Sequence, residues 1–399
     1  MGGGECVMAT YYVNGSTGDD ATTDATSDGG AYETIQGAFD DLAENDPEGG
    51  AAFQAGDIIS IANGTYTELT NPTKPWVVKS TSAAATGVII TSSGTGKTVD
   101  LGSTTSGITF QDITINYTHS KGSNKGAIIC SGAPLVTFQR CIIGSTSYGV
   151  YYPGNLSTFD RCQFAHIAGQ TSTYNHGIIS SRSMTVQSCL FLNWLKYAIY
   201  ANQGSNDQQT IKNCTVILQS GFTSTGGLFL NGDGSGGPSL ANTIIYNAGT
   251  MGIGIRVSST ADVCVIKNNL VYNDGGTMTV TSEYFRTDAS TTANNWSTDH
   301  SSETEADHTV DSGENLFVNY AGGDYSPDAD GSAAGNGLAS LAATTDYAGN
   351  SFSSPPSIGC YEQASSGWSG GSSVGPTATG GCASVGGTAI GSISEIIGV

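Results

Sequence analysis

Positively charged residues are scarce in this sequence of 399 residues. It has 13 lysines and arginines against 34 aspartates and glutamates, which gives a formal net charge of −21. Nucleic acids, anionic membranes and acidic polysaccharides bind proteins through Lys and Arg, so a chain this acidic is poorly suited to all three. We therefore expect no nucleic-acid partner and no polyanionic substrate.

Long apolar runs are missing as well. The most apolar window, residues 189–201, is interrupted by Asn193 and Lys196 and is too short to cross a bilayer. The first ten residues have neither the basic start nor the apolar stretch of a secretory signal. We therefore expect no insertion into a membrane and no signal peptide of this kind.

Closely paired cysteines, such as the C-x-x-C of zinc sites, are absent although the chain has nine cysteines. Nine is an odd number, and four of them fall at one fixed place in a repeated pattern. We expect these four to be buried free thiols, because unpaired Cys is among the most buried residue types. Disulfides between repeats are the alternative. No metal and no cofactor is expected.

The repeated pattern is eight residues long and recurs through the middle of the chain. The copy at 136–143 reads VTFQRCII and the copy at 157–164 reads STFDRCQF. Repeats 21 to 29 residues apart, built from short alternating segments, predict a solenoid in which equivalent positions stack. The sixth positions of the copies would form one structural column: Ile113, Cys141, Cys162, Cys189, Cys214, Thr243 and Asn269.

Each copy predicts two strands joined at a bend, because side chains alternate on both sides of the fourth and fifth positions. The bend carries Asn213, Asn242 and Asn268 in the later copies, and Asn tolerates the left-handed backbone of such a turn. A third short strand follows in each repeat, as at 149–152 and 198–201. Three strands per repeat predict a parallel coil.

The chain divides by composition into five parts. Residues 1–75 contain a first strand and a short amphipathic helix with apolar residues at 35, 38, 39 and 42, which we expect to cover the open first rung. The repeats fill 76–280, and 281–362 is expected to end the coil. Residues 363–382 form a Gly/Ser-rich linker, and 383–399 an apolar tail.

Two stretches carry a resemblance to a known family. The sequence YETIQGAF at 32–39, followed by GDIISIANGTY at 56–66, resembles the opening of right-handed parallel β-helix proteins of the pectate-lyase-like class. Residues 315–362 resemble the closing region of the same class. The resemblance implies an all-β protein, a right-handed single-stranded parallel β-helix with three strands per rung and an N-terminal capping helix.

The tail pairs with itself at a period of 11 residues and is similar to short C-terminal repeats of bacteriophage structural proteins. The resemblance implies a segment for assembly into a particle. The apolar residues expected to make these contacts are Val385, Ile390, Ile393, Ile396 and Ile397.

Catalysis on acidic sugars needs carboxylates and a nearby basic residue. The candidates are Asp112, Asp160, Asp233, Arg140, Arg161, Arg182 and Arg256. Most flank the bend, where solvent-facing charges are ordinary, and this favours a structural role.

Two short motifs match known functional elements only in part. Asn175–Gly177 resembles the Gly-His-Gly of polygalacturonases without their other elements, which favours a lone surface histidine. The loop at 231–237 lacks the spacing of a calcium loop. We therefore predict no catalytic, cofactor-binding or metal-binding residue.

The leading hypothesis is a non-enzymatic virion structural protein: a decoration, fibre or spike that presents a β-helix rod on a phage surface. Its partners would be other virion proteins, further copies of itself, with trimers the commonest arrangement for such spikes, and a glycan on the host surface. One alternative is a polysaccharide lyase or hydrolase, either a phage depolymerase or a secreted enzyme. Another is a secreted adhesin at the cell surface.

Overall fold

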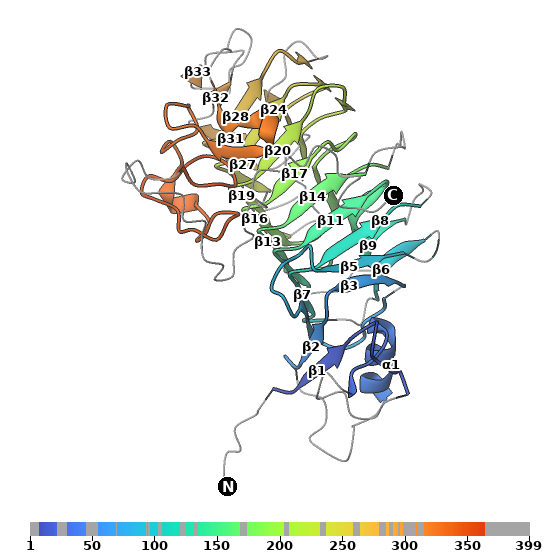
Figure 1. Ribbon diagram of the computed structural model, residues 1–399. Helices are drawn as coiled ribbons and strands as arrows, with labels where there is room; N and C mark the ends of the chain where they lie inside the picture. The colour runs from blue at the N-terminus through green and yellow to red at the C-terminus, as the bar shows by residue number, and fades with distance from the viewer. Residues whose placement is uncertain are drawn as a thin grey trace.

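The computed structural model describes residues 8–363 apart from 22–29, 45–54, 69, 93, 95, 103–105, 120–124, 131–134, 168–173, 203–206, 232–236, 258–263, 279–284, 287–289, 294–295, 298–307 and 310–314. The expected all-β parallel coil is confirmed (Figure 1). The predicted tail lies outside the described residues, so the role of its apolar side chains stays a prediction.

Sheet A contains the first strand of each repeat, and its neighbouring strands are parallel. Its strands, in order along the coil, are β1 (Thr10–Val13), β2 (Ile58–Ile61), β4 (Val77–Ser80), β7 (Thr109–Gln111), β10 (Thr137–Gln139), β13 (Ser157–Asp160), β16 (Met184–Gln187), β19 (Gln209–Lys212), β23 (Ser239–Ala241), β27 (Cys264–Lys267) and β31 (Ser290–Ala293).

Sheet B contains the second strand of each repeat, just after the bend. Its strands are β3 (Gly64–Thr67), β5 (Val88–Thr91), β8 (Thr114–Tyr117), β11 (Ile142–Ser145), β14 (Gln163–His166), β17 (Leu190–Leu192), β20 (Thr215–Leu218), β24 (Ile244–Asn247), β28 (Leu270–Asn273), β32 (Trp296–Ser297) and β33 (His308–Thr309).

Sheet C contains the third strand of each repeat: β6 (Lys97–Leu101), β9 (Gly126–Cys130), β12 (Tyr148–Tyr151), β15 (Ile178–Ser180), β18 (Ile199–Asn202), β22 (Leu228–Asn231), β26 (Ile255–Val257) and β30 (Phe285–Arg286). A small fourth sheet joins β21 (Thr223–Ser224), β25 (Thr250–Met251) and β29 (Thr277–Met278). The three long sheets enclose the core.

Identical side chains stack from rung to rung inside the coil. Phe138 lies between Phe110 and Phe159, with ring centroids 5.2 and 5.4 Å apart and nearly parallel planes. These three residues are register partners in sheet A and are fully buried. In-register stacking of this kind makes each rung cover the apolar face of the next.

The bend between sheets A and B is a single residue in the left-handed conformation. Its φ is 49° at both Asn213 and Asn242 and 57° at Asn268. This conformation explains the asparagines, whose short polar side chains tolerate it better than most. Arg140 and Arg161 adopt it in the earlier rungs, with φ of 52° and 54°.

The predicted helix is α1 (Ile35–Glu44), and it lies at the N-terminal end of the coil (Figure 1). Its four apolar positions are all buried. Phe39 stacks on Trp76 at 4.9 Å, which joins the helix to the first rungs. Elsewhere in the described chain, too, no helix is long and apolar enough to cross a membrane.

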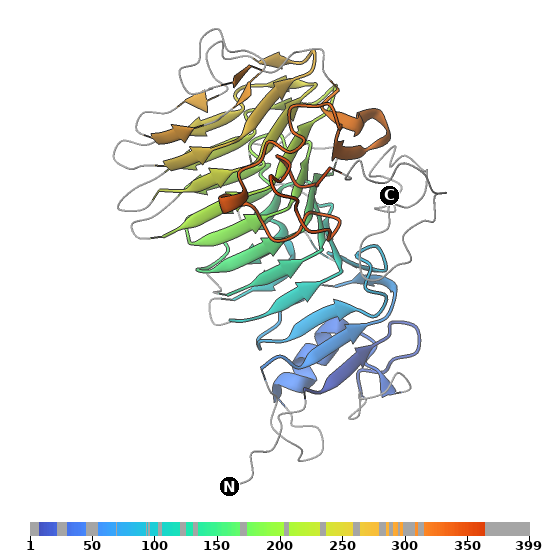
Figure 2. The same ribbon diagram turned by 90° about the vertical axis from the view of Figure 1, so that its left-hand side faces the viewer.

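Residues 315–363, which we call the strap, run back along the side of the coil (Figure 2). They contain β34 (Phe317–Asn319), η3 (Tyr320–Gly322), β35 (Asp324–Pro327) and η4 (Ala339–Leu341). Strands β30 to β33 of the preceding segment continue the rungs, whereas the strap covers the outer face of sheet B. The apolar residues in this contact are Ala165, Leu190, Leu192, Ile217, Ile244, Tyr246, Leu270 and Tyr272 from the coil, and Leu316, Phe317, Tyr325, Ala333, Ile358 and Cys360 from the strap.

Candidate functional site

The charged residues at the bend form buried ion pairs. Arg140 donates two hydrogen bonds of 2.7 Å to the carboxylate of Asp112, one to each oxygen. Asp112 is only 1% exposed, so the expectation of solvent-facing charge was wrong here. A buried carboxylate held bidentately by a guanidinium is satisfied as a structural group, and it is not available as an acid or base.

Asp160, one rung after Gln139, is held by one hydrogen bond from an arginine and two from glutamines. Its carboxylate accepts hydrogen bonds from Arg161 at 3.0 Å, Gln187 at 3.0 Å and Gln139 at 3.3 Å. Arg182 lies 3.8 Å from Asp207 at an exposed position. Asp233 lies outside the described residues. The sequence candidates therefore do not converge on one catalytic centre.

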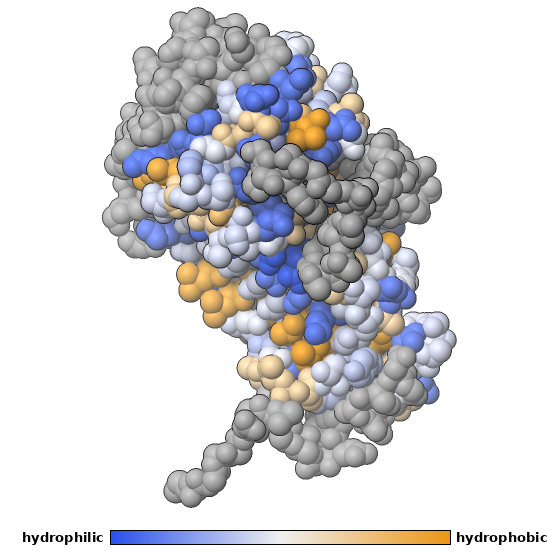
Figure 3. Space-filling model, turned by 60° about the vertical axis from the view of Figure 1, so that its left-hand side comes forward, coloured by the Kyte–Doolittle hydropathy of each residue, from blue (hydrophilic) through white to orange (hydrophobic). Residues whose placement is uncertain are grey.

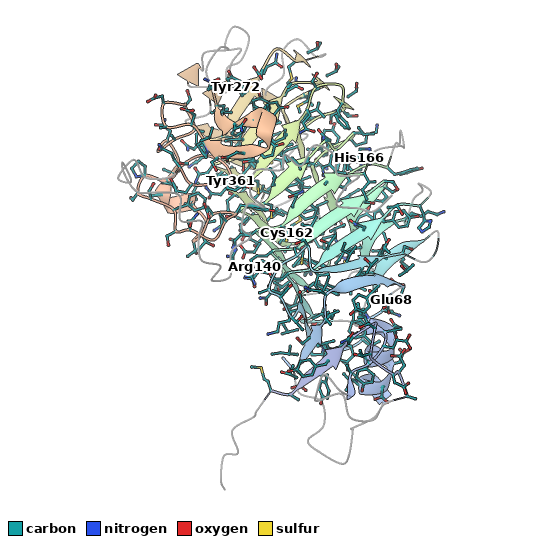
Figure 4. The ribbon with its side chains drawn as sticks, viewed as in Figure 1. Glu68, Arg140, Cys162, His166, Tyr272 and Tyr361 are labelled. Carbon is teal, nitrogen blue, oxygen red and sulfur yellow. The ribbon has the colours of Figure 1, made fainter. Side chains whose placement is uncertain are left out.

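Each residue of the column predicted from the repeat directly follows a bend residue in the chain, and Figure 4 labels Cys162 of the column and Arg140 of the bend. All seven of its side chains are buried: Ile113, Cys141, Cys162, Cys189, Cys214, Thr243 and Asn269. Its cysteines are free. Burial raises the pKa of the Cys141 and Cys189 thiols well above the ordinary value, whereas at Cys162 burial is outweighed by the hydrogen bonds to these two thiols, which lower the pKa of that thiol to about 5. The Cys141 and Cys189 thiols are therefore poor nucleophiles and poor metal ligands. Among the residues that the structure describes, no cluster of His, Cys, Asp and Glu could hold a metal ion.

His176 is not the surface histidine that the sequence indicated. It is 8% exposed, and its ring lies between those of Tyr148 and Tyr197, with both centroids 5.9 Å away. Burial, together with the charge of Lys196, lowers its pKa to about 3. His176 is therefore a neutral member of an aromatic cluster.

This cluster lies on the outer face of sheet C. Tyr151, Ile179, Tyr200, Phe229 and Arg256 are consecutive register partners in strands β12, β15, β18, β22 and β26. The residue before each of them points into the core and is fully buried, as the alternation of a strand requires. Ile129 of β9 precedes Tyr151 in the same register. One outward column of sheet C is thus apolar over five rungs and ends in a cation.

A second group of rings lies beside the first, at the start of strand β12 and just before strands β15 and β18. The ring of Tyr148 is 4.7 Å from that of Tyr151, and the ring of Tyr197 is 5.9 Å from that of Tyr200. Tyr200 stacks on Phe229 at 4.4 Å with an interplanar angle of 10°. We call the whole set the aromatic face: Tyr148, Tyr151, Tyr152, Tyr174, His176, Ile179, Tyr197, Tyr200 and Phe229.

The tyrosines of the aromatic face are neutral hydrogen-bonding groups. Burial raises the pKa values of Tyr148, Tyr151 and Tyr200 above the ordinary tyrosine value, so their hydroxyls stay protonated at neutral pH. Tyr174 is 40% exposed at the edge of the face. Rings with a hydroxyl at one end offer both an apolar surface and polar contacts.

Few charges border the aromatic face. Asp100 lies one rung beyond Ile129 at the N-terminal end of the outward column and forms an ion pair with Lys97. Arg256 lies over the ring of Phe229, 5.5 Å from its centroid, at the other end. Between these two residues the described part of the column carries no carboxylate. The described residues of the face therefore offer apolar ring surfaces and tyrosine hydroxyls, and they include no pair of carboxylates for acid–base chemistry.

Sequence reasoning missed this face although the signal was present. The third-strand segments carry large side chains at their outward positions, which a half-exposed strand normally fills with polar residues. The large aromatic side chains at positions 151, 200 and 229 are therefore the sequence signal from which this face could have been predicted.

Comparison with known proteins gives a likeness of fold only. No protein-family model matches the chain, and no curated protein does. Among solved structures, pectate lyase Pel9A aligns with a TM-score of 0.55 at 13% identity, over 89% of this chain and 96% of its own. Pectin methylesterase from Aspergillus niger aligns with a TM-score of 0.49 at 15% identity, over 72% and 91% of the two chains. The first of these alignments supports the right-handed parallel β-helix of the pectate-lyase-like class.

Proposed function

We propose that this protein recognises an uncharged polysaccharide with the aromatic face of sheet C. The observation that carries the proposal is the outward column of Tyr151, Ile179, Tyr200 and Phe229. Tyr151, Ile179 and Tyr200 are half-buried and Phe229 is buried, so the column presents only the outer edges of its side chains to solvent. A contiguous row of partly exposed apolar side chains is a candidate contact surface. Sugar rings present flat C–H faces that pack on aromatic rings, and their hydroxyls suit the tyrosine hydroxyls.

The arrangement supports an extended ligand. Rungs of a parallel coil are about 4.8 Å apart, so Tyr151 and Tyr200, two rungs apart, can contact different sugar units of one chain. The net charge of −21 argues for a neutral glycan, because an acidic one would be repelled.

Cleavage of the glycan is the second candidate activity. The fold is shared with a protein named as a pectate lyase, and this favours the polysaccharide-active alternative from the sequence over a purely structural role. The described residues of the aromatic face carry no pair of carboxylates of the kind that glycoside hydrolysis needs. We therefore place binding before cleavage.

The test is affinity electrophoresis of the purified protein in gels that contain neutral polysaccharides, followed by a reducing-end assay on each one that retards it. Tyr200→Ala should weaken the retardation at least tenfold, because it removes the central ring of the column. Tyr12→Ala, on the outer face of sheet A, is the matched control and should change nothing. If no neutral glycan retards the protein, or if Tyr200→Ala binds like the wild type, the proposal is wrong. New reducing ends would establish cleavage in place of simple binding.

The hypothesis that the protein is part of a bacteriophage particle is compatible with glycan recognition. It rests on the sequence resemblance of residues 383–399 alone. It stays a prediction.

A further inference from the structure

Two asparagine side chains lie beside the aromatic face, on the outer surface of sheet C. Asn202 ends β18 and Asn231 ends β22, and the two residues are register partners. Each follows a residue of the aromatic face by two positions, Asn202 after Tyr200 and Asn231 after Phe229. Because side chains alternate along a strand, each amide lies on the same side of the sheet as its aromatic neighbour, about 7 Å further along the strand.

The two amides are joined by a hydrogen bond that leaves one group open on each. Nδ2 of Asn231 donates to Oδ1 of Asn202 at 2.6 Å. Both residues are partly exposed, and within the part of the chain that the structure describes neither Nδ2 of Asn202 nor Oδ1 of Asn231 has a further hydrogen-bond partner. The pair therefore offers a ligand one open donor and one open acceptor, and both are uncharged.

An acetamido group matches these open groups. Its carbonyl oxygen can accept from Nδ2 of Asn202, and its N–H can donate to Oδ1 of Asn231, so an acetamido group can extend the chain of amides at either end. Hydrogen bonds in such a chain strengthen one another. The methyl of the acetamido group is apolar and suits the rings of Tyr200 and Phe229 beside the amides.

Other substituents of a sugar match the amide pair less well. A carboxylate only accepts hydrogen bonds and cannot use the open acceptor of Asn231, and an ammonium only donates and cannot use the open donor of Asn202. A hydroxyl can do both, but it brings no apolar surface to the neighbouring rings. The combination of a donor, an acceptor and an apolar border therefore favours an acetamido group.

We propose that the polysaccharide recognised by the aromatic face contains N-acetylated amino sugars, and that Asn202 and Asn231 select them. This inference rests on the proposed function, because the amide pair borders the face that would bind the glycan. It adds the chemical class of the sugar, which is uncharged and carries both a ring face for Tyr200 and an acetamido group for the amides.

The experiment is isothermal titration of the full chain with two hexasaccharides of the same linkage, one of N-acetylglucosamine and one of glucose. The N-acetylated hexasaccharide should bind at least tenfold more tightly. Asn202→Asp keeps an oxygen that accepts from Asn231 but replaces the open donor with an acceptor, so this preference should fall at least fivefold. Tyr200→Ala removes the stacking ring and should weaken the binding of both hexasaccharides.

Asn63→Asp makes the same chemical change at an exposed turn and is the matched control, whose preference should stay within twofold of wild type. If glucose hexasaccharide binds as tightly as the N-acetylated one, or if Asn202→Asp keeps the preference, this inference is wrong and the proposed function stands. If neither binds, the inference is also wrong, while retardation by another neutral polysaccharide would still support the proposed function. Circular dichroism melts of each variant establish that loss of binding is not loss of fold.

Discussion

Asn242 and Leu338 hold each other by two hydrogen bonds. The side-chain amide of Asn242 donates to the carbonyl oxygen of Leu338 at 3.0 Å, and the backbone N–H of Leu338 donates to Oδ1 of Asn242 at 2.8 Å. Asn213 also binds the strap, one rung earlier. Its Oδ1 accepts a hydrogen bond of 2.8 Å from the backbone N–H of Ala343. The asparagines of the bend therefore make the turn and also bind the strap.

The first prediction concerns this double role. Asn242→Asp keeps the shape and the tolerance for the left-handed backbone, but the carboxylate cannot donate to Leu338 and is buried without a charge partner. We expect a loss of about 1–3 kcal/mol in the free energy of unfolding, measured by urea denaturation, together with faster amide exchange in the strap. Asn63→Asp makes the same change at an exposed turn and should cost little. Equal effects of the two variants would contradict the role of Asn242.

The coil could be predicted from the sequence because its signals are local and repeat. Alternation in each strand, the bend asparagines and the stacked column all lie within one rung of about 25 residues. The strap could not be placed in this way. Its contacts join Leu338 to Asn242 and Ala343 to Asn213, 96 and 130 residues apart, and no period in the sequence reports them.

The bend charges show the same limit. Asp112 and Arg140 occupy equivalent positions on neighbouring rungs, which the repeat spacing does indicate. The repeat spacing does not indicate that the two side chains form an ion pair or that Asp112 is buried. Both depend on how the side chains lie across neighbouring rungs, whereas turn residues are ordinarily exposed to solvent.

The second prediction tests this pair. In Asp112→Asn the new asparagine adopts a φ of 57° at least as easily as aspartate does, so we expect no added backbone strain. The change removes the Asp112 counter-charge from the Arg140 guanidinium, whose side chain is only 15% exposed, and we expect a loss of about 2–3 kcal/mol in the free energy of unfolding. The comparison is Asp207→Asn, whose partner Arg182 is exposed, with an expected cost below about 1 kcal/mol. If Asp112→Asn lowered the free energy of unfolding as little as Asp207→Asn does, the Asp112–Arg140 pair would contribute nothing to stability.

The third prediction concerns the apolar tail. Deletion of residues 383–399 should abolish incorporation of the protein into phage particles, measured by immunoblotting of purified particles, while the coil keeps its melting temperature. Deletion of residues 366–380 shortens the linker and leaves the tail in place, so it should preserve incorporation. If particles lacking the tail carry the protein at the wild-type level, the assembly role assigned to Val385 and Ile396 is wrong.

The fourth prediction concerns acid. Burial lowers the pKa of His166 to about 4 and that of His176 to about 3, against an ordinary value of 6.5. Between the pKa of each histidine in the folded chain and its value of 6.5 in the unfolded chain, the unfolded chain binds a proton that the folded chain does not. The free energy of unfolding should therefore fall as the pH drops from about 6.5 towards 4.

Two buried carboxyls act in the opposite direction, since burial raises the pKa of Glu68 and of Asp346 above the ordinary range. The contribution of His176 is therefore isolated with His176→Phe, which fits the aromatic face and cannot be protonated. Between pH 7 and pH 4.5 the wild type should lose about 2–3 kcal/mol more in the free energy of unfolding than this variant. His119→Phe, outside the aromatic face, should follow the wild type. If His176→Phe loses as much stability as the wild type over this range, the ring of His176 accepts a proton in the folded protein, and its place between Tyr148 and Tyr197 does not keep it neutral.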